Sequence, residues 1–107
     1  MTINDLQLQE EINNSFTHTI HCQVGFIDYF VFPSEIYING LLIYREYRRQ
    51  GWGSKLLMSV VNQHKDKDIR LRCQPMDNVP YENLVRFYER LGFVMGIGGF
   101  MRKEKQE

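Results

Sequence analysis

The stretch RRQGWGSKLL, residues 48–57, marks a change in hydrophobic period, and this change most constrains the fold. Before it, residues 16–43 are rich in β-branched and aromatic side chains, which favour strands. After it, apolar residues recur at the spacing of one helical face. These residues are Trp52, Leu56, Leu57, Val60 and Val61. The chain therefore predicts strands that lead into a helix, with two glycines and several cations at the junction.

The order of the expected elements favours a mixed α/β (α+β) fold. In chain order, we expect strands at 15–23, 25–32 and 36–44, a helix to about His64, and a strand at 69–74. A second helix follows, and FVMGIGGFMRK predicts two short strands around a glycine-rich turn, which gives the order β-β-β-α-β-α-β-β. Gly25 is the only turn-forming residue at the break between the first two expected strands, so one long bent strand is the alternative. We expect a mostly antiparallel mixed sheet in a single domain, residues 1–107, because this length suffices for one core.

The second helix has clear end signals in the sequence. Asp77 or Asn78 can cap its start, and Pro80 is tolerated in its first turn. Gly92 suits a left-handed stop, with Phe93 folding back on the helix. The apolar face comprises Leu84, Phe87, Tyr88 and Leu91.

Charge and composition exclude several classes of function. Thirteen basic residues balance thirteen acidic ones, so nucleic acid is not an expected partner. No signal peptide or membrane-length apolar run is present in the sequence, and we expect a cytoplasmic protein without a membrane partner. Cys22 and Cys73 fit reduced core residues in that compartment. No metal site is expected, because His18 and Cys22 would face one side of a strand and His21 the other.

The helix start at the junction has the chemistry of an anion site. The first turn of a helix offers unpaired backbone N–H groups and partial positive charge. Gly51 and Gly53 let a ligand approach the backbone, and Arg48, Arg49 and Lys55 add charge. The order of residues fits neither a P-loop nor a dinucleotide-binding fingerprint. From this stretch alone, a solvated cationic turn is the alternative to a phosphate site.

Two signatures in order resemble the GNAT superfamily of N-acetyltransferases. Arg48, two residues, then Gly51-Trp52-Gly53 is similar to the family's acetyl-CoA pyrophosphate motif, Gln/Arg-x-x-Gly-x-Gly/Ala. The segment LVRFYERLGF, residues 84–93, is similar to the second family signature, and the terminal FMRK resembles the family's closing strand. The resemblance covers roughly residues 35–102. It identifies the chain as a small, N-terminally shortened member of the family.

The resemblance implies an enzyme that transfers an acetyl group from acetyl-CoA to a primary amine, on a small molecule or on a protein. It implies a coenzyme site made of a strand edge and the helix start: Leu42, Ile43, Tyr44, Arg48, Arg49, Gln50, Gly51, Trp52, Gly53 and Ser54. Tyr88 falls on the family's tyrosine, which can protonate the departing thiolate. As a member of an apolar helical stripe, Tyr88 also fits a core residue that only finds a hydrogen-bond partner.

The proton acceptor for the amine is less well marked. Family members often use a glutamate on the motif strand, and here that position aligns with Tyr37. Glu35 lies two residues earlier on the same face and is the candidate base, against the alternative of a solvated strand start. Asp28 and Glu46 are weaker candidates.

Two departures from the family pattern bear on function. Tyr81 stands where the family often has asparagine, so a catalytically inactive module that binds coenzyme A or a protein partner is the alternative function. Only about 15 residues precede the first expected strand, where most members place a strand and two helices. We therefore expect an acceptor groove that is open or completed by a second subunit of a homodimer. A nucleic-acid contact at the cationic turn is a third hypothesis, which the balanced charge disfavours.

Overall fold

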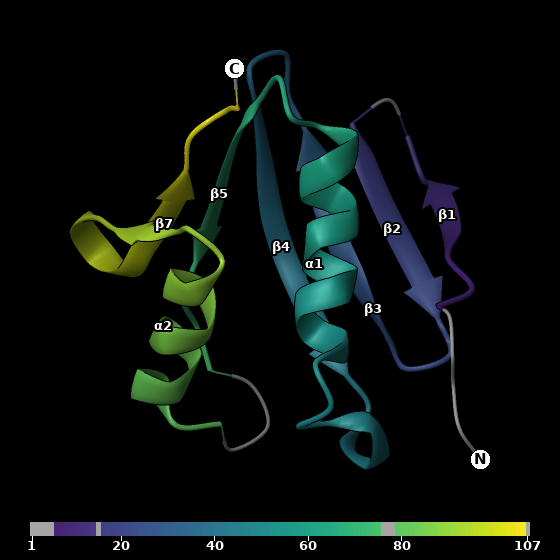
Figure 1. Ribbon diagram of the computed structural model, residues 1–107. Helices are drawn as coiled ribbons and strands as arrows, with labels where there is room; N and C mark the ends of the chain where they lie inside the picture. The colour runs from purple at the N-terminus through teal and green to yellow at the C-terminus, as the bar shows by residue number, and fades with distance from the viewer. Residues whose placement is uncertain (1–5, 15, 76–78, 107) are drawn as a thin grey trace.

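A seven-stranded sheet and two α-helices make up the chain over residues 6–14, 16–75 and 79–106, which the computed structural model describes (Figure 1). The strands are β1 (Gln9–Ile12), β2 (Thr17–Cys22), β3 (Gly25–Val31), β4 (Glu35–Ile43), β5 (Asp68–Arg72), β6 (Val94–Met95) and β7 (Phe100–Lys103). The helices are α1 (Trp52–Gln63) and α2 (Tyr81–Arg90), with short 3₁₀ turns at Arg45–Tyr47 and Ile97–Gly99. The sheet order is β1-β2-β3-β4-β5-β7-β6, and only β4 and β5 pair in parallel. The mixed, mostly antiparallel sheet is confirmed.

The first two predicted strands are separate, and they form a hairpin. Cys22 pairs with Gly25 across the two residues between them. A Cβ at Gly25 would overlap the Leu42 carbonyl oxygen, so β4 lies against this glycine. The alternative of one long bent strand is therefore excluded.

The predicted order lacks one strand at its start. β1 was missed because all four of its residues are exposed and show no apolar alternation. Cross-strand contacts hold it instead: the Tyr29 hydroxyl donates to Glu10 Oε1 at 2.7 Å, and His18 Nδ1 lies 2.9 Å from the same oxygen. The corrected order is β-β-β-β-α-β-α-β-β.

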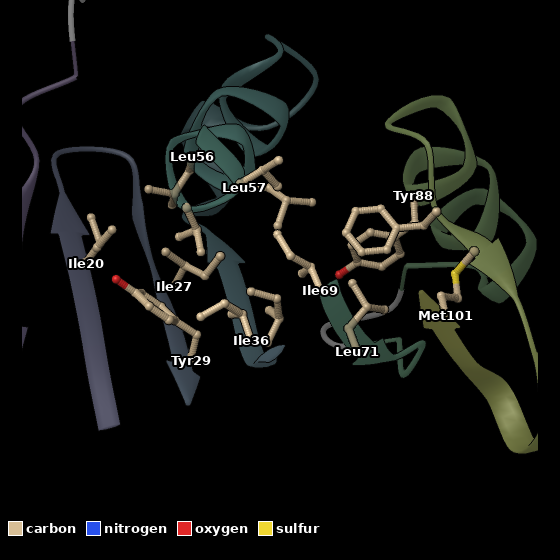
Figure 2. Packing of buried hydrophobic residues seen from close by; sticks show 14 of the residues in the cluster. Ile20, Ile27, Tyr29, Ile36, Leu56, Leu57, Ile69, Leu71, Tyr88 and Met101 are labelled. Atoms are coloured by element: carbon tan, nitrogen blue, oxygen red, sulfur yellow. The ribbon is translucent and has the colours of Figure 1, made fainter. Parts of the chain in front are cut away.

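Both helices pack against one face of the sheet. The predicted stripe on α1 is buried, and Figure 2 shows Leu56 and Leu57 of α1 and Tyr88 of α2 pointing toward the same face of the strands. Beneath them lie fully buried residues from the sheet: Ile20, Ile27, Tyr29, Ile36, Ile69, Leu71 and Met101. This burial of apolar surface is the main source of stability.

The end of α2 follows the predicted glycine stop. Gly92 has φ +96°, and the Phe93 N–H donates to the Tyr88 carbonyl oxygen at 3.1 Å. Phe93 folds back and is buried, with its ring centroid 5.8 Å from that of Tyr88. At the start, Pro80 occupies the N-cap position rather than the first turn, and the proposed caps Asp77 and Asn78 lie outside the described residues.

The opposite face of the sheet carries no helix in the described parts of the chain (Figure 1). Aromatic side chains cover its middle: Phe30 and Tyr37 stack with centroids 6.3 Å apart. Toward β5 and β7 the face becomes cationic, with Arg70 5.6 Å from the Phe100 ring centroid and 3.7 Å from the Glu35 carboxylate. Among the described helices, neither is long and apolar enough to span a membrane.

Candidate active site

Two parallel strands that separate create the candidate site. β4 and β5 pair from Glu35–Asp68 to Ile38–Leu71, whereas β4 continues to Ile43. A bulge at Asn39 interrupts the pairing with β3 immediately beyond Ile38. Figure 1 shows the two strands diverging toward the start of α1. The β5-facing edge of residues 39–43 is thus open to a ligand that can add as a strand.

A cleft of about 690 Å³ occupies this separation. Its walls are the open edge of β4, the end of β5, the first turn of α1 and one face of α2. Four arginines line it: Arg48, Arg49, Arg72 and Arg90. No aspartate or glutamate is among the described residues of the lining. The cleft therefore favours an elongated anionic ligand.

The two glycines at the start of α1 have different roles. Gly51 is the N-cap residue with φ +84°, a backbone conformation that side chains with a Cβ rarely adopt. Gly53 lies inside the helix, and a Cβ there would meet Phe87 Cζ at 3.3 Å. Gly53 thus permits close packing of α1 on α2, while Gly51 makes the turn. The Lys55 N–H closes the first helical bond to the Gly51 carbonyl, so the amides that precede it have no partner inside the helix, and Gly51, Gly53 and Ser54 line the cleft.

Two of the three cations at the turn, Arg48 and Lys55, are held by specific contacts. Arg48 Nε donates to the Ile43 carbonyl oxygen at 2.9 Å, which fixes this side chain at the end of β4. Arg49 is exposed and has φ +63°, the left-handed region. Lys55 lies with its ammonium 4.7 Å from the Trp52 ring centroid and is not part of the described lining. The charge that the cleft offers at this end therefore comes from the arginines.

Tyr88 lies in the cleft wall and is 7% exposed. Burial raises the pKa of Tyr88 to about 12, and the neighbouring Cys73 thiol contributes to the rise. Its ring contacts Phe87 and Phe93 edge to face, with centroids 5.1 and 5.8 Å away. The phenol is protonated at neutral pH and can act as a proton donor.

The structure brings most of the predicted coenzyme residues together around the cleft. The predicted residues that line it are Leu42, Ile43, Arg48, Arg49, Gly51, Trp52, Gly53, Ser54 and Tyr88. Tyr44 and Gln50 flank the cleft without lining it, and Gln50 Oε1 instead accepts from Trp52 Nε1 at 3.2 Å. Glu35 lies outside the lining, where β4 and β5 are still paired, and its carboxylate faces Arg70.

Several lining residues were not identified from the sequence. Among them are Arg72, Gln74, Asn83 and Arg90. Asn83 and Arg90 lie one helical turn before and after Phe87 of the apolar stripe of α2, and this spacing was the available signal. Tyr81, which departs from the family asparagine, is exposed and does not line the cleft. Asn83 is the asparagine of α2 that lines it.

Comparisons with known proteins agree with this geometry. The model of the acetyltransferase (GNAT) domain matches residues 14–95. The structure is similar to that of the anti-CRISPR protein AcrVA5, with a TM-score of 0.72 and 28% identity over 81% of this chain and 97% of the other. It is also similar to the ribosomal-protein-S18-alanine N-acetyltransferase from Escherichia coli, with a TM-score of 0.74, 15% identity and coverage of 89% and 73%. A third similar structure is the PaiA N-acetyltransferase from Thermoplasma acidophilum in complex with coenzyme A, with a TM-score of 0.66, 18% identity and coverage of 83% and 61%. Among curated protein sequences no significant match is found.

Proposed function

The chain belongs to the GNAT acetyltransferase family, and we propose that it transfers the acetyl group of acetyl-CoA to a primary amine by direct attack. The observation that carries this proposal is the cleft between the separated strands. It combines an open strand edge, a helix N-terminus, four arginines and a protonated tyrosine. These features complement an elongated anionic thioester. The catalytically inactive module that only binds coenzyme A or a protein partner remains the alternative.

The residues of the cleft divide between phosphate binding and the arm that carries the acetyl group. The amides of Gly51 to Ser54, with Arg48 and Arg49, would hold the pyrophosphate. The backbone edge at Leu42 and Ile43 would pair with the pantetheine arm. Tyr44, at the end of the strand edge, and Gln50, before the helix start, would lie beside the coenzyme site without lining the cleft.

Bound acetyl-CoA supplies an acetyl group on a thioester whose carbonyl carbon the amine attacks. Tyr88 is proposed to donate its proton to the departing sulfur, since its raised pKa keeps the phenol protonated. A backbone N–H at the Asn39 bulge is proposed to meet the developing oxyanion. Glu35 stays a sequence-based prediction for the base.

The acceptor is proposed to approach from the sheet face that carries no helix in the described residues. That approach leaves room for an amine on a small molecule or on a protein surface.

The same open face could be completed by a second copy of the chain, as the homodimer prediction requires. Sedimentation at micromolar concentration tests it, and a monomer mass counts against the dimer.

Thermal unfolding with and without acetyl-CoA tests coenzyme binding. Acetyl-CoA at millimolar concentration should raise Tm by mass action, and Arg49→Glu should reduce that rise. Arg86→Glu is the matched control, because Arg86 is exposed on α2 and outside the described lining. An unchanged Tm for the wild type would contradict both the enzyme and the coenzyme-binding module. A raised Tm without thiol release on any amine would favour the module.

A further inference from the structure

The proposed transfer requires a group that accepts a proton from the acceptor ammonium. An inference about the residue that accepts this proton rests on the proposed function. Amines are ammonium ions near neutral pH and must lose a proton before they attack. The described lining of the cleft contains neither a carboxylate nor a histidine. A side chain of the described residues that accepts this proton would therefore lie beside the lining and reach into it.

Asp28 lies in that position. It is on β3, directly opposite Gly40 of β4, next to the bulge at Asn39 and close to the point where β4 and β5 separate. The Thr19 hydroxyl donates to Asp28 Oδ1 at 2.7 Å, and this bond orients the carboxylate. The other oxygen, Oδ2, is the atom that a Cβ on Gly40 would meet, at 4.0 Å.

Nothing among the described residues accounts for the absence of a side chain at position 40. Gly40 is not among the positive-φ residues, so its backbone conformation does not require glycine. Among the described residues, a Cβ there would have only the Asp28 oxygen within 4 Å, at an ordinary contact distance. Gly40 itself lines the cleft. The glycine thus keeps open the space between the Asp28 carboxylate and the cleft.

Other described carboxylates on the open face of the sheet, the face without a described helix, contact cations or a histidine. Glu35 faces Arg70 at 3.7 Å, Asp68 pairs with Arg102, and Glu11 lies 3.4 Å from His21. Asp28 differs, because it accepts its hydrogen bond from a neutral hydroxyl. Its charge therefore stays available to a cation that enters from the open face.

We infer that Asp28 is a catalytic residue that binds the acceptor ammonium and accepts its proton. The neutral amine then attacks the thioester carbonyl, so that a C–N bond forms and the C–S bond breaks. Two protons leave the nitrogen in total. Asp28 accepts one and passes it to solvent. The other also leaves to solvent, and Tyr88 regains from solvent the proton that it gave to the sulfur. The products are the acetamide, the free thiol and one proton.

Thiol release from acetyl-CoA with two surrogate amines tests this role. Propylamine is an ammonium ion at about pH 7.5 and must lose a proton before it attacks, whereas hydroxylamine is largely neutral and needs no such first step. The spontaneous reaction of hydroxylamine with the thioester is measured without protein and subtracted. Asp28→Asn should lower kcat with propylamine by about 100-fold and leave the rate with hydroxylamine within about threefold. The variant keeps the oxygen that accepts from Thr19, and Asp66→Asn, beyond the C-terminal end of α1, is the control that should leave both rates unchanged.

The outcomes separate this inference from the proposed function. If the wild type releases thiol with neither amine, the transfer itself is wrong, and the Asp28 role is overturned with it. If the wild type is active and Asp28→Asn keeps its propylamine rate, or loses both rates equally, only the role of Asp28 is overturned. If Glu35→Gln instead gives the loss that is selective for propylamine, Glu35 is the base, and the inference for Asp28 is wrong.

Discussion

Ile38 and Leu71 form the last pair between β4 and β5, and beyond them the only parallel pair of the described sheet separates. Both residues are buried and line the cleft, so the core continues up to the point of separation. The bulge at Asn39 begins on the next residue of β4. A rigid core thus ends where the flexible acyl arm of a coenzyme could begin, which places the proposed chemistry on well-packed strands.

Gly25 should be the glycine of the sheet least tolerant of a side chain. Its Cβ would overlap the Leu42 carbonyl oxygen, and backbone atoms cannot move without breaking the β3–β4 pairing. We expect Gly25→Ala to lower the free energy of unfolding by about 3 kcal/mol. Gly40→Ala is the matched control, because a Cβ there meets only ordinary contact, and it should change the free energy by less than about 0.5 kcal/mol. Urea titration measures both, and equal stabilities would contradict the contact.

A larger side chain at position 40 should separate stability from activity. Valine favours strands, and Gly40 has open space on the face without helices, so Gly40→Val should fold with a free energy of unfolding within about 1 kcal/mol of the wild type. The Tm rise with acetyl-CoA should persist, because the new side chain points away from the helices. Thiol release with propylamine should fall, since the side chain stands between Asp28 and the cleft. A stable variant with the wild-type rate would show that this space is not used.

The sequence predicted the elements whose burial follows a period. Leu56 and Val60 lie on the apolar stripe of α1 and are fully buried in the core, as their spacing indicated. Gly92 stops α2 because its conformation is a local property of glycine. β1 could not be predicted in the same way, because it is held by contacts from Glu10 to residues of other strands rather than by a pattern of its own.

The candidate site was predictable only where a motif is continuous in the sequence. Gly51 and Ser54 belong to one turn of the chain, so the motif alone was enough to predict that they line the same part of the cleft. Arg72 and Arg90 enter the cleft because β4 and β5 separate, a tertiary event with no local signal. Asp28 was only a weaker candidate from the sequence, because its place beside the cleft depends on the register between β3 and β4 and on the bulge, which shifts the pairing by one residue.

Acid should destabilise the protein through two titrating side chains, His64 after the end of α1 and Glu10 on β1. Burial lowers the pKa of His64 below its ordinary value of 6.5, with the charge of Lys67 adding to the effect. The unfolded chain therefore takes up a proton at a pH where folded His64 stays neutral, so stability falls as the pH drops below about 6.5. Hydrogen bonds from His18 and Tyr29 lower the pKa of Glu10, so a further loss follows below about pH 4.5.

His64→Phe separates the two phases of this acid effect. The ring would keep the edge contact with Tyr29, whose centroid lies 5.9 Å away, and would remove the titrating group. Thermal unfolding between about pH 7.5 and 5 should then show a flatter profile than the wild type, while the loss below about pH 4.5 remains. A profile identical to the wild type in the upper range would assign the effect to another group.

Replacing Tyr88 by phenylalanine should remove the proton donor without opening the core. The ring contacts with Phe87 and Phe93 stay, so the free energy of unfolding should change by less than about 1 kcal/mol, and the Tm rise with acetyl-CoA should persist. The rate of thiol release should fall by roughly 100-fold, because the sulfur then leaves without a proton. Tyr47→Phe is the matched control, since Tyr47 also lines the cleft but belongs to the turn that precedes α1.

Because the pKa of Tyr88 is raised to about 12, the wild-type rate should show no loss from phenol ionisation up to about pH 10. Tyr88→Phe at the wild-type rate would mean that Tyr88 is a core residue and that solvent supplies the proton.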